Sequence, residues 1–269
     1  LPRMAEYTDG IERINIELSL RNKLKLCDAL QDFLARPDLP CARQGDAQGI
    51  PARELLGDRV AQAQALLADV RALWQGWLDN VAGLFPQLQD HSLRASWKAQ
   101  LRQPLADIFV GAAFEPILQE AAAIHQKVLK GRVWVALHMH AGDGNVHTNI
   151  PVNSDDYEML QTAHEAVARI MQLARSLDGV ISGEHGIGIT KLEFLTPEEL
   201  APFAEYKRRV DPEGRFNWGK LLRNQELLAQ YPQGQSADIA QKRSRTSLRY
   251  ADLTNAYTPS FGLMGHESL

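Results

Sequence analysis

Apolar and polar residues alternate most sharply between Val133 and His140. A period of two residues is typical of a strand with one buried face and one face that carries polar side chains. The pair Asp143-Gly144 then supplies the positive φ angles that a short chain reversal needs, and the alternation resumes over residues 145–150. We therefore predict a β-hairpin whose loop spans residues 141–144.

Two further strands and several helices are expected around this hairpin. Residues 13–20 alternate with Ile14, Ile16, Leu18 and Leu20 on one face, which predicts a strand, and Val180-Ile181 predicts another short one. Apolar residues spaced by three and four predict helices. These helices cover residues 21–34, 60–81, 92–101, 104–114, 117–128 and 157–177, and a last one begins after Thr196, with Pro197 in its first turn and Glu199 completing a capping box.

The order of these elements predicts an α+β fold. With the helical segment of residues 38–114 set aside as a long insertion, the order is that of a ferredoxin-like antiparallel sheet with helices on one face. We expect one domain over residues 1–228. Beyond it the composition turns to Gln, Ser and Arg, so residues 229–269 are interpreted as a linker toward a further C-terminal module.

Composition narrows the functional classes. The 269 residues carry a net charge of −4, which does not favour nucleic-acid binding, since that requires a basic face. We find no apolar run of membrane-spanning length and no signal peptide. Two cysteines are too few for a disulfide framework or an iron-sulfur site, so we expect a cytoplasmic protein, with peripheral attachment to the inner membrane left open. The abrupt ends suggest a piece of a longer polypeptide.

The predicted hairpin gathers three histidines on one face. If residues 141–144 close it directly, His138 lies opposite His147, and His140 lies opposite Asn145. His140 and His147 are then diagonal neighbours at about 7 Å. Either pair of histidines could share a metal ion. The alternative is a polar strand face on which the histidines are merely solvated.

A carboxylate completes a ligand set. In the predicted sheet the loop after Ile181 brings Glu184 and His185 toward the histidine face. Two imidazoles and one carboxylate leave coordination positions open on a divalent metal, as in catalytic zinc and non-haem iron sites. We assign His140, His147 and Glu184 as ligands of zinc, iron or manganese, and leave His138 as the spare. His185, next to a ligand, suits a general base.

Three sequence blocks then resemble a known family. They are His-Ala-Gly-Asp-Gly-Asn-Val-His-Thr-Asn from residue 140, Gly-Glu-His-Gly-Ile-Gly from residue 183, and Asp-Pro-Glu-Gly-Arg-Phe-Asn-Trp-Gly-Lys from residue 211. Together they resemble the C-terminal substrate domain of FAD-linked oxidases of the vanillyl-alcohol-oxidase fold group, and within it the glycolate, D-lactate and D-2-hydroxyglutarate dehydrogenases. The resemblance covers roughly residues 10 to 225.

The resemblance implies a role for each matching residue. By this resemblance, His140 and His147 are the paired metal ligands and Glu184 is the carboxylate ligand. His185 is the catalytic base. Asn149 resembles a substrate-contacting asparagine. Relatives carry a basic residue near Asn15, and Arg13 is expected to substitute for it in substrate binding. The residues expected toward the flavin are Asn145, Asn217 and Lys220. Trp218 stands where proline is usual, a difference for which the sequence offers no explanation.

The implied activity is oxidation of a D-2-hydroxy acid, with hydride transfer to FAD. The family binds most of its FAD through an N-terminal domain that these residues do not contain, so we expect this piece to be inactive alone. The long insertion resembles long bacterial members that carry a flavin module before this domain and an iron-sulfur module after it. Two other hypotheses stay open, namely a free-standing metal-dependent hydrolase with the same His2Glu site, and a docking module whose site has decayed.

Overall fold

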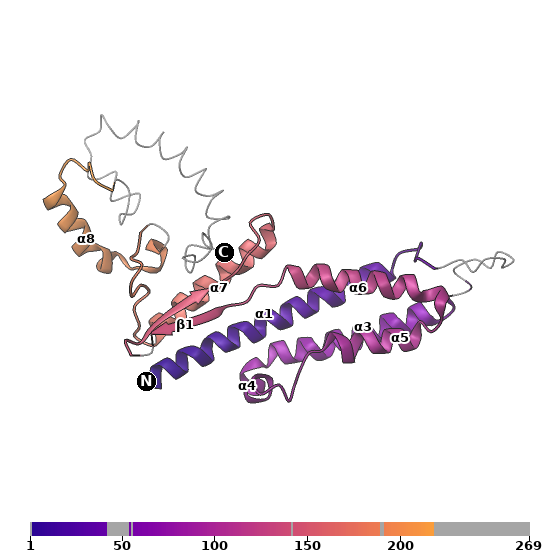
Figure 1. Ribbon diagram of the computed structural model, residues 1–269. Coiled ribbons are helices and arrows are strands. Elements are labelled where there is room, and N and C mark those ends of the chain that lie inside the picture. The colour runs from indigo at the N-terminus through magenta and orange to yellow at the C-terminus, as the bar shows by residue number, and fades with distance from the viewer. Residues whose placement is uncertain (1, 42–53, 55, 141, 189–190, 218–269) are drawn as a thin grey trace. The chain divides into compact units, whose positions relative to one another are not determined.

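The computed structural model describes residues 2–41, 54, 56–140, 142–188 and 191–217 (Figure 1). The chain divides into two compact units, Glu12–Trp134 on the one hand and Leu1–Ile11 with Val135–Leu269 on the other. The first helix, α1 (Pro2–Leu34), contributes residues to both. The described residues combine many helices with one small antiparallel sheet, which confirms the α+β class.

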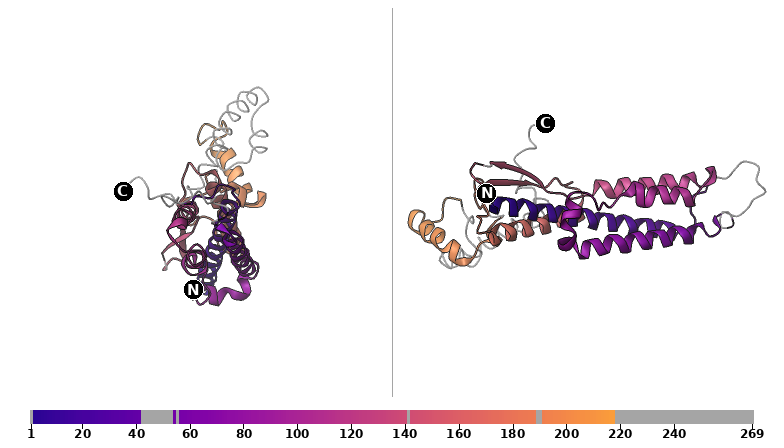
Figure 2. Two further views of the ribbon diagram at one scale, coloured as in Figure 1. Left: turned by 90° about the vertical axis from the view of Figure 1, so that its right-hand side faces the viewer. Right: turned by 90° about the horizontal axis from the view of Figure 1, so that it is seen from below.

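The unit Glu12–Trp134 is helical. Besides the later part of α1 it contains the α-helices α3 (Arg59–Asp79), α4 (Val81–Gln89), α5 (Gln103–Ile108) and α6 (Glu115–Lys130), the π-helix η1 (Trp97–Arg102) and the 3-10 turn η2 (Ala112–Phe114). Long helices of this unit run alongside one another, as the two views of Figure 2 show. Their apolar stripes enclose a core in which Trp74 is fully buried. The helices predicted around residues 60–81 and 117–128 are thus confirmed.

The strand predicted over residues 13–20 is wrong, because these residues lie inside α1. The side chains of Ile14 and Leu18 are buried, and so are those of Leu20 and Leu24. Each pair is spaced by four residues, so the helix buries two different sides. A helix buried on two sides can produce the same short run of alternating apolar residues as a strand, and here the helical spacing continues on both sides of the run.

The other unit contains the predicted hairpin. Strand β1 (Ala136–His140) pairs antiparallel with β2 (Asn145–Asn149), and the register places His138 opposite His147 and His140 opposite Asn145, as predicted. The backbone N–H groups of Asp143 and Gly144 both donate to the carbonyl of His140 at 3.1 Å. Gly144 has a φ of 72°, a left-handed conformation that glycine adopts without a steric penalty.

Two helices follow the hairpin. The helix α7 (Tyr157–Ser176) is capped by Asp156, whose carboxylate accepts a hydrogen bond from the backbone N–H of Met159. Its end is closed by the Gly179 N–H, which donates to the Ala174 carbonyl at 2.8 Å. After the turn η3 (Leu192–Phe194), α8 (Pro197–Val210) begins with the predicted capping box.

The ferredoxin-like arrangement is not confirmed. Val180 and Ile181 form no strand in the structure, and the only sheet among the described residues has two strands. Helices make up most of the described part of residues 38–114, but their status as an insertion into such a sheet is likewise not confirmed. The single domain over residues 1–228 stays a prediction. The predicted linker 229–269 lies outside the described residues, as do Trp218 and Lys220.

No helix among the described residues is long and apolar enough to cross a membrane.

Candidate metal centre

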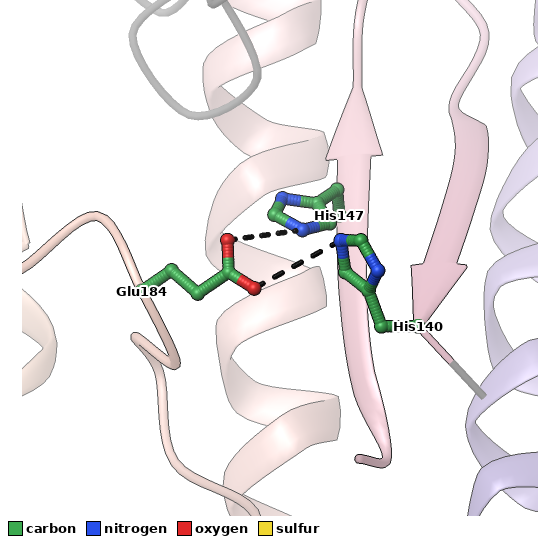
Figure 3. Close-up of side chains that lie close together, drawn as sticks. All are labelled: His140, His147 and Glu184. Carbon is green, nitrogen blue, oxygen red and sulfur yellow. Dashed lines mark ion pairs between the residues drawn. The ribbon is translucent and has the colours of Figure 1, made fainter. Parts of the chain in front are cut away.

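The hairpin and the loop after Ile181 bring three potential metal ligands together. His140 ends β1, His147 lies in the middle of β2, and Glu184 belongs to the loop. The Nε2 atoms of His140 and His147 lie 3.9 Å and 3.6 Å from the two carboxylate oxygens of Glu184. In Figure 3 the carboxylate points toward both imidazole rings. One ligand atom from each residue lies within 4.8 Å of the others, so the set assigned from the sequence converges in space.

The donor set fits a divalent metal. Metal–ligand bonds of about 2.0–2.2 Å place tetrahedral ligand atoms roughly 3.3–3.6 Å apart. The candidate ligand atoms lie within 4.8 Å of one another, so they would have to approach by at most about 1.5 Å. The His147 Nε2 atom is buried and has no hydrogen-bond partner among the described residues. A buried polar nitrogen without a partner is costly, and a metal ion would satisfy it. The set has no preference that would identify zinc, iron or manganese.

His138 lies outside this ligand set. Its ring centroid is 5.7 Å from that of His140 and 6.0 Å from that of His147, and its side chain is exposed. The side chains whose ligand atoms lie within 4.8 Å of one another are those of His140, His147 and Glu184, and His138 is not among them. The structure therefore places the residue that we left as the spare beside the candidate site rather than in it.

Asn145 holds the carboxylate in place. Its Nδ2 donates to Glu184 Oε1 at 2.6 Å, across 39 residues of sequence. A Cβ added at Gly183 would lie 2.6 Å from Asn145 Oδ1, so the loop can come this close to the strand because residue 183 has no side chain. We expected Asn145 near the flavin. The structure instead shows it in direct contact with a candidate metal ligand.

His185 also contacts a candidate ligand. Its Nε2 lies 3.3 Å from Nδ1 of His147, and which nitrogen donates depends on the tautomers. If His147 uses Nε2 for a metal, its Nδ1 carries the proton and donates to His185. An outer partner of this kind commonly orients a metal-bound imidazole. The exposed ring of His185 is thus placed both to orient His147 and to reach a molecule bound beside it.

A cavity of about 610 Å³ lies beside these residues, and its lining includes His147, Glu184 and His185. Its wall also contains Tyr7 from α1 and Lys191, neither of which we singled out from the sequence. Burial raises the pKa of Tyr7 to about 12, so its hydroxyl stays protonated. The volume is in the range of small-molecule sites.

Lys191 anchors the loop that carries Glu184. It is 8% exposed, and its Nζ donates to the Ser182 hydroxyl at 3.2 Å. The Ser182 hydroxyl in turn donates to the Gly186 carbonyl at 2.8 Å, which closes the loop around Glu184 and His185. Burial lowers the pKa of Lys191. Nothing in the local pattern distinguishes this lysine from an exposed one, so sequence reasoning missed it.

The remaining predicted site residues are not among the three converging side chains. Asn149 ends β2 opposite Ala136 and is half-buried. Arg13 belongs to the unit Glu12–Trp134, where its guanidinium lies 4.5 Å from the centre of the Phe85 ring. Asn217 is exposed, with a φ of 44°. It follows a turn in which the Asp211 carboxylate accepts from the backbone N–H groups of Arg215 and Phe216.

The sequence matches a family of known proteins. The family described as "FAD linked oxidases, C-terminal domain" matches residues 114–221, a segment that contains the hairpin, Glu184 and His185. No solved structure matches the chain significantly.

Curated relatives agree with this match. A D-lactate dehydrogenase of Archaeoglobus fulgidus is 44% identical over 87 residues, which are 31% of this chain and 19% of the relative. A D-2-hydroxyglutarate dehydrogenase of Stutzerimonas stutzeri is 29% identical over 216 residues, or 72% of this chain and 45% of the relative. Glycolate oxidase subunit GlcD of Escherichia coli is 36% identical over 92 residues, which are 33% of this chain and 18% of the relative.

The matches with these three relatives cover less than half of each relative's length. All three are named as oxidases or dehydrogenases, so the hydrolase alternative receives no support.

Proposed function

Because residues 114–221 match the family described as "FAD linked oxidases, C-terminal domain", we propose that the chain is the substrate- and metal-binding part of a flavin-dependent dehydrogenase of D-2-hydroxy acids. The names of the relatives support the substrate class, since lactate, 2-hydroxyglutarate and glycolate are all 2-hydroxy acids. The reaction removes a proton from the hydroxyl group and a hydride from the adjacent carbon. FAD, when bound, supplies the hydride acceptor.

The observation that carries this proposal is the convergence of His140, His147 and Glu184 beside a cavity. These residues would hold a divalent ion, which polarises a bound hydroxyl and makes its proton easier to remove. A 2-hydroxy acid offers such an ion its hydroxyl and one carboxylate oxygen. The side chains of His140 and Glu184 are each about half exposed. This exposure leaves room for the hydroxyl and the carboxylate of the substrate to approach.

His185 is the proposed base. It stands beside His147 on the cavity wall, and a neutral imidazole has a ring nitrogen that can accept the substrate proton. While His147 donates from Nδ1, His185 Nε2 is occupied as an acceptor. Because the Nδ1 of a neutral His185 then carries the ring proton, His185 must release His147 before its Nε2 can take the substrate proton. This competition makes the His147–His185 contact part of the proposed reaction.

Other parts of the proposal rest on the family resemblance. Asn149 and Arg13 would contact the substrate, and Asn217 and Lys220 would lie toward the flavin. Because the family that the chain resembles binds most of its FAD through an N-terminal domain, we place most of the FAD binding in such a partner domain. We also propose a downstream iron-sulfur module as an electron partner. A chain without the flavin-binding partner domain would then be inactive.

The test uses the flavoprotein expressed from its whole gene. Under anaerobic conditions, D-2-hydroxy acids such as D-lactate should bleach the flavin absorbance, and the L-enantiomers should not. Replacing the proposed base by His185→Gln should slow bleaching about 10²- to 10⁴-fold, the usual contribution of a general base. The variant should retain most of its flavin. A protein that carries no flavin, or a His185→Gln variant that bleaches at the normal rate, would contradict the proposal.

A further inference from the structure

A second group of polar side chains surrounds a small cavity in the unit Glu12–Trp134. Lys23 of α1, His125 of α6 and Arg132 just after α6 line it. The helix α6 lies alongside α1 in Figure 1. Ser19 and Asn22, one turn or less before Lys23, add a hydroxyl and an amide to the wall. The five side chains supply the donor groups that proteins use to bind oxyanions.

The charge of this cluster is not balanced by protein carboxylates. No ion pair joins Lys23, Arg132 or the nearby Arg94 to an acidic side chain among the described residues. The carbonyl groups at the end of α6 supply only about half a negative charge. Two fixed positive charges, those of Lys23 and Arg132, thus line one cavity with little to offset them, and the charge of Arg94 acts on Lys23 from nearby.

The cluster is also partly removed from water. Burial lowers the pKa of Lys23 most, and the charges of Arg132 and Arg94 lower it further. The ring of His125 is stacked on Trp97, with 4.6 Å between centroids and 7° between planes, which fixes its orientation beside Lys23. A bound anion would offset both the desolvation of the lysine and its repulsion by the arginines.

We propose that the cavity binds one phosphate group, either as inorganic phosphate or as the end of a small phosphate monoester. Its volume of about 40 Å³ exceeds what a single water molecule requires, but it leaves no space for a nucleotide. The two cationic side chains that line the cavity, Lys23 and Arg132, match the charge of a phosphate dianion better than that of a single carboxylate. The fork of the Arg132 guanidinium and the compact Lys23 ammonium can contact different oxygens of a tetrahedral group. The site is independent of the proposed dehydrogenase function.

Phosphate binding can be measured directly on the full chain. Calorimetric titration with inorganic phosphate, with glycerol phosphate and with acetate, all at one ionic strength, separates the possible ligands. We expect phosphate to bind more tightly than acetate, and to raise the temperature of unfolding, since a ligand of the folded state stabilises it. Tighter binding of glycerol phosphate than of inorganic phosphate would identify a monoester as the natural ligand, and the reverse would identify the free ion.

Two variants and one control locate the site. Lys23→Met and Arg132→Gln should each weaken phosphate binding about tenfold or more, because each removes a charged hydrogen-bond donor. Lys127→Gln, an exposed lysine on α6 outside the cavity, should leave it unchanged. In phosphate-free buffer Lys23→Met should unfold at the same or a higher temperature, since it relieves repulsion, so loss of binding would not reflect loss of folding.

Two results would overturn the proposal. One is equal affinity of phosphate for the wild-type chain, Lys23→Met and Arg132→Gln. The other is stabilisation by phosphate that chloride at the same ionic strength reproduces, because this would mean general screening and not a site.

Discussion

The Asn145 amide donates a hydrogen bond of 2.6 Å to the carboxylate of Glu184, and so links the hairpin to the loop that supplies the third candidate ligand. Outer contacts of this kind hold a metal ligand in the orientation that binding requires. Asn145→Ala should therefore weaken binding of a divalent metal about 10- to 100-fold. Competition with a chromophoric chelator measures the affinity.

Asn149→Ala provides the matched control for Asn145. Both asparagines lie on the same face of β2, but Asn149 is at the far end of the strand, opposite Ala136. Its replacement should leave the metal affinity unchanged. If Asn145→Ala binds metal as tightly as the wild type, the amide does not position Glu184.

The contact between Asn145 and Glu184 also requires that residue 183 has no side chain. In Gly183→Ala the new Cβ would lie 2.6 Å from Asn145 Oδ1, so the loop or the strand must shift. A shift of this size should lower the metal affinity at least about tenfold, by analogy with the loss of outer-shell contacts. Gly142→Ala is the control, because no atom lies within 4 Å of a Cβ added there. Equal losses in the two variants would contradict this explanation.

The hydrogen bond from Lys191 to Ser182 should contribute to the stability of the same loop. Ser182→Ala removes an acceptor for a buried ammonium group and a donor to the Gly186 carbonyl. We expect it to lower the free energy of unfolding by about 1–3 kcal/mol. With Lys191→Met, a double-mutant cycle in denaturant should give a coupling energy of roughly 1 kcal/mol. Additive effects of the two substitutions would show that this hydrogen bond is not important.

His125 should make the stability of the protein depend on pH. Burial, and then the charge of Lys23, lowers the pKa of His125 below its ordinary value of 6.5. The unfolded chain therefore binds a proton more readily than the folded chain, and the stability is complete above pH 6.5 and decreases as the pH falls below it. Denaturant unfolding at several pH values should show a weaker acid dependence in His125→Gln. Identical curves for variant and wild type would contradict the assignment.

The sequence predicted those parts of the structure that depend on neighbouring residues. The loop 141–144 and the alternation on both sides of it determine the pairing of His138 with His147, since a slip of one residue would reverse every side chain. The capping box of α8 likewise needs only Thr196 and Glu199. We predicted that Glu184 approaches the histidines on the basis of a sheet that the structure does not confirm. The candidate ligands nevertheless lie close together.

The errors have physical reasons too. Four alternating apolar residues between Ile14 and Leu20 fit a strand, but they also fit a helix buried on two sides. Val180-Ile181 is too short for a pattern to decide. The contacts of Asn145 with Glu184 and of Lys191 with Ser182 depend on how distant segments approach each other, which local patterns do not contain.

Metal affinity in the His147→Ala and His138→Ala variants tests the central claim most directly. The two histidines face each other across the hairpin, but only His147 belongs to the converging set. We predict that the wild-type protein binds a divalent ion, that His147→Ala loses this binding, and that His138→Ala retains it. A wild-type protein that binds no zinc, iron or manganese, or a loss of binding in His138→Ala but not in His147→Ala, would contradict the proposed centre.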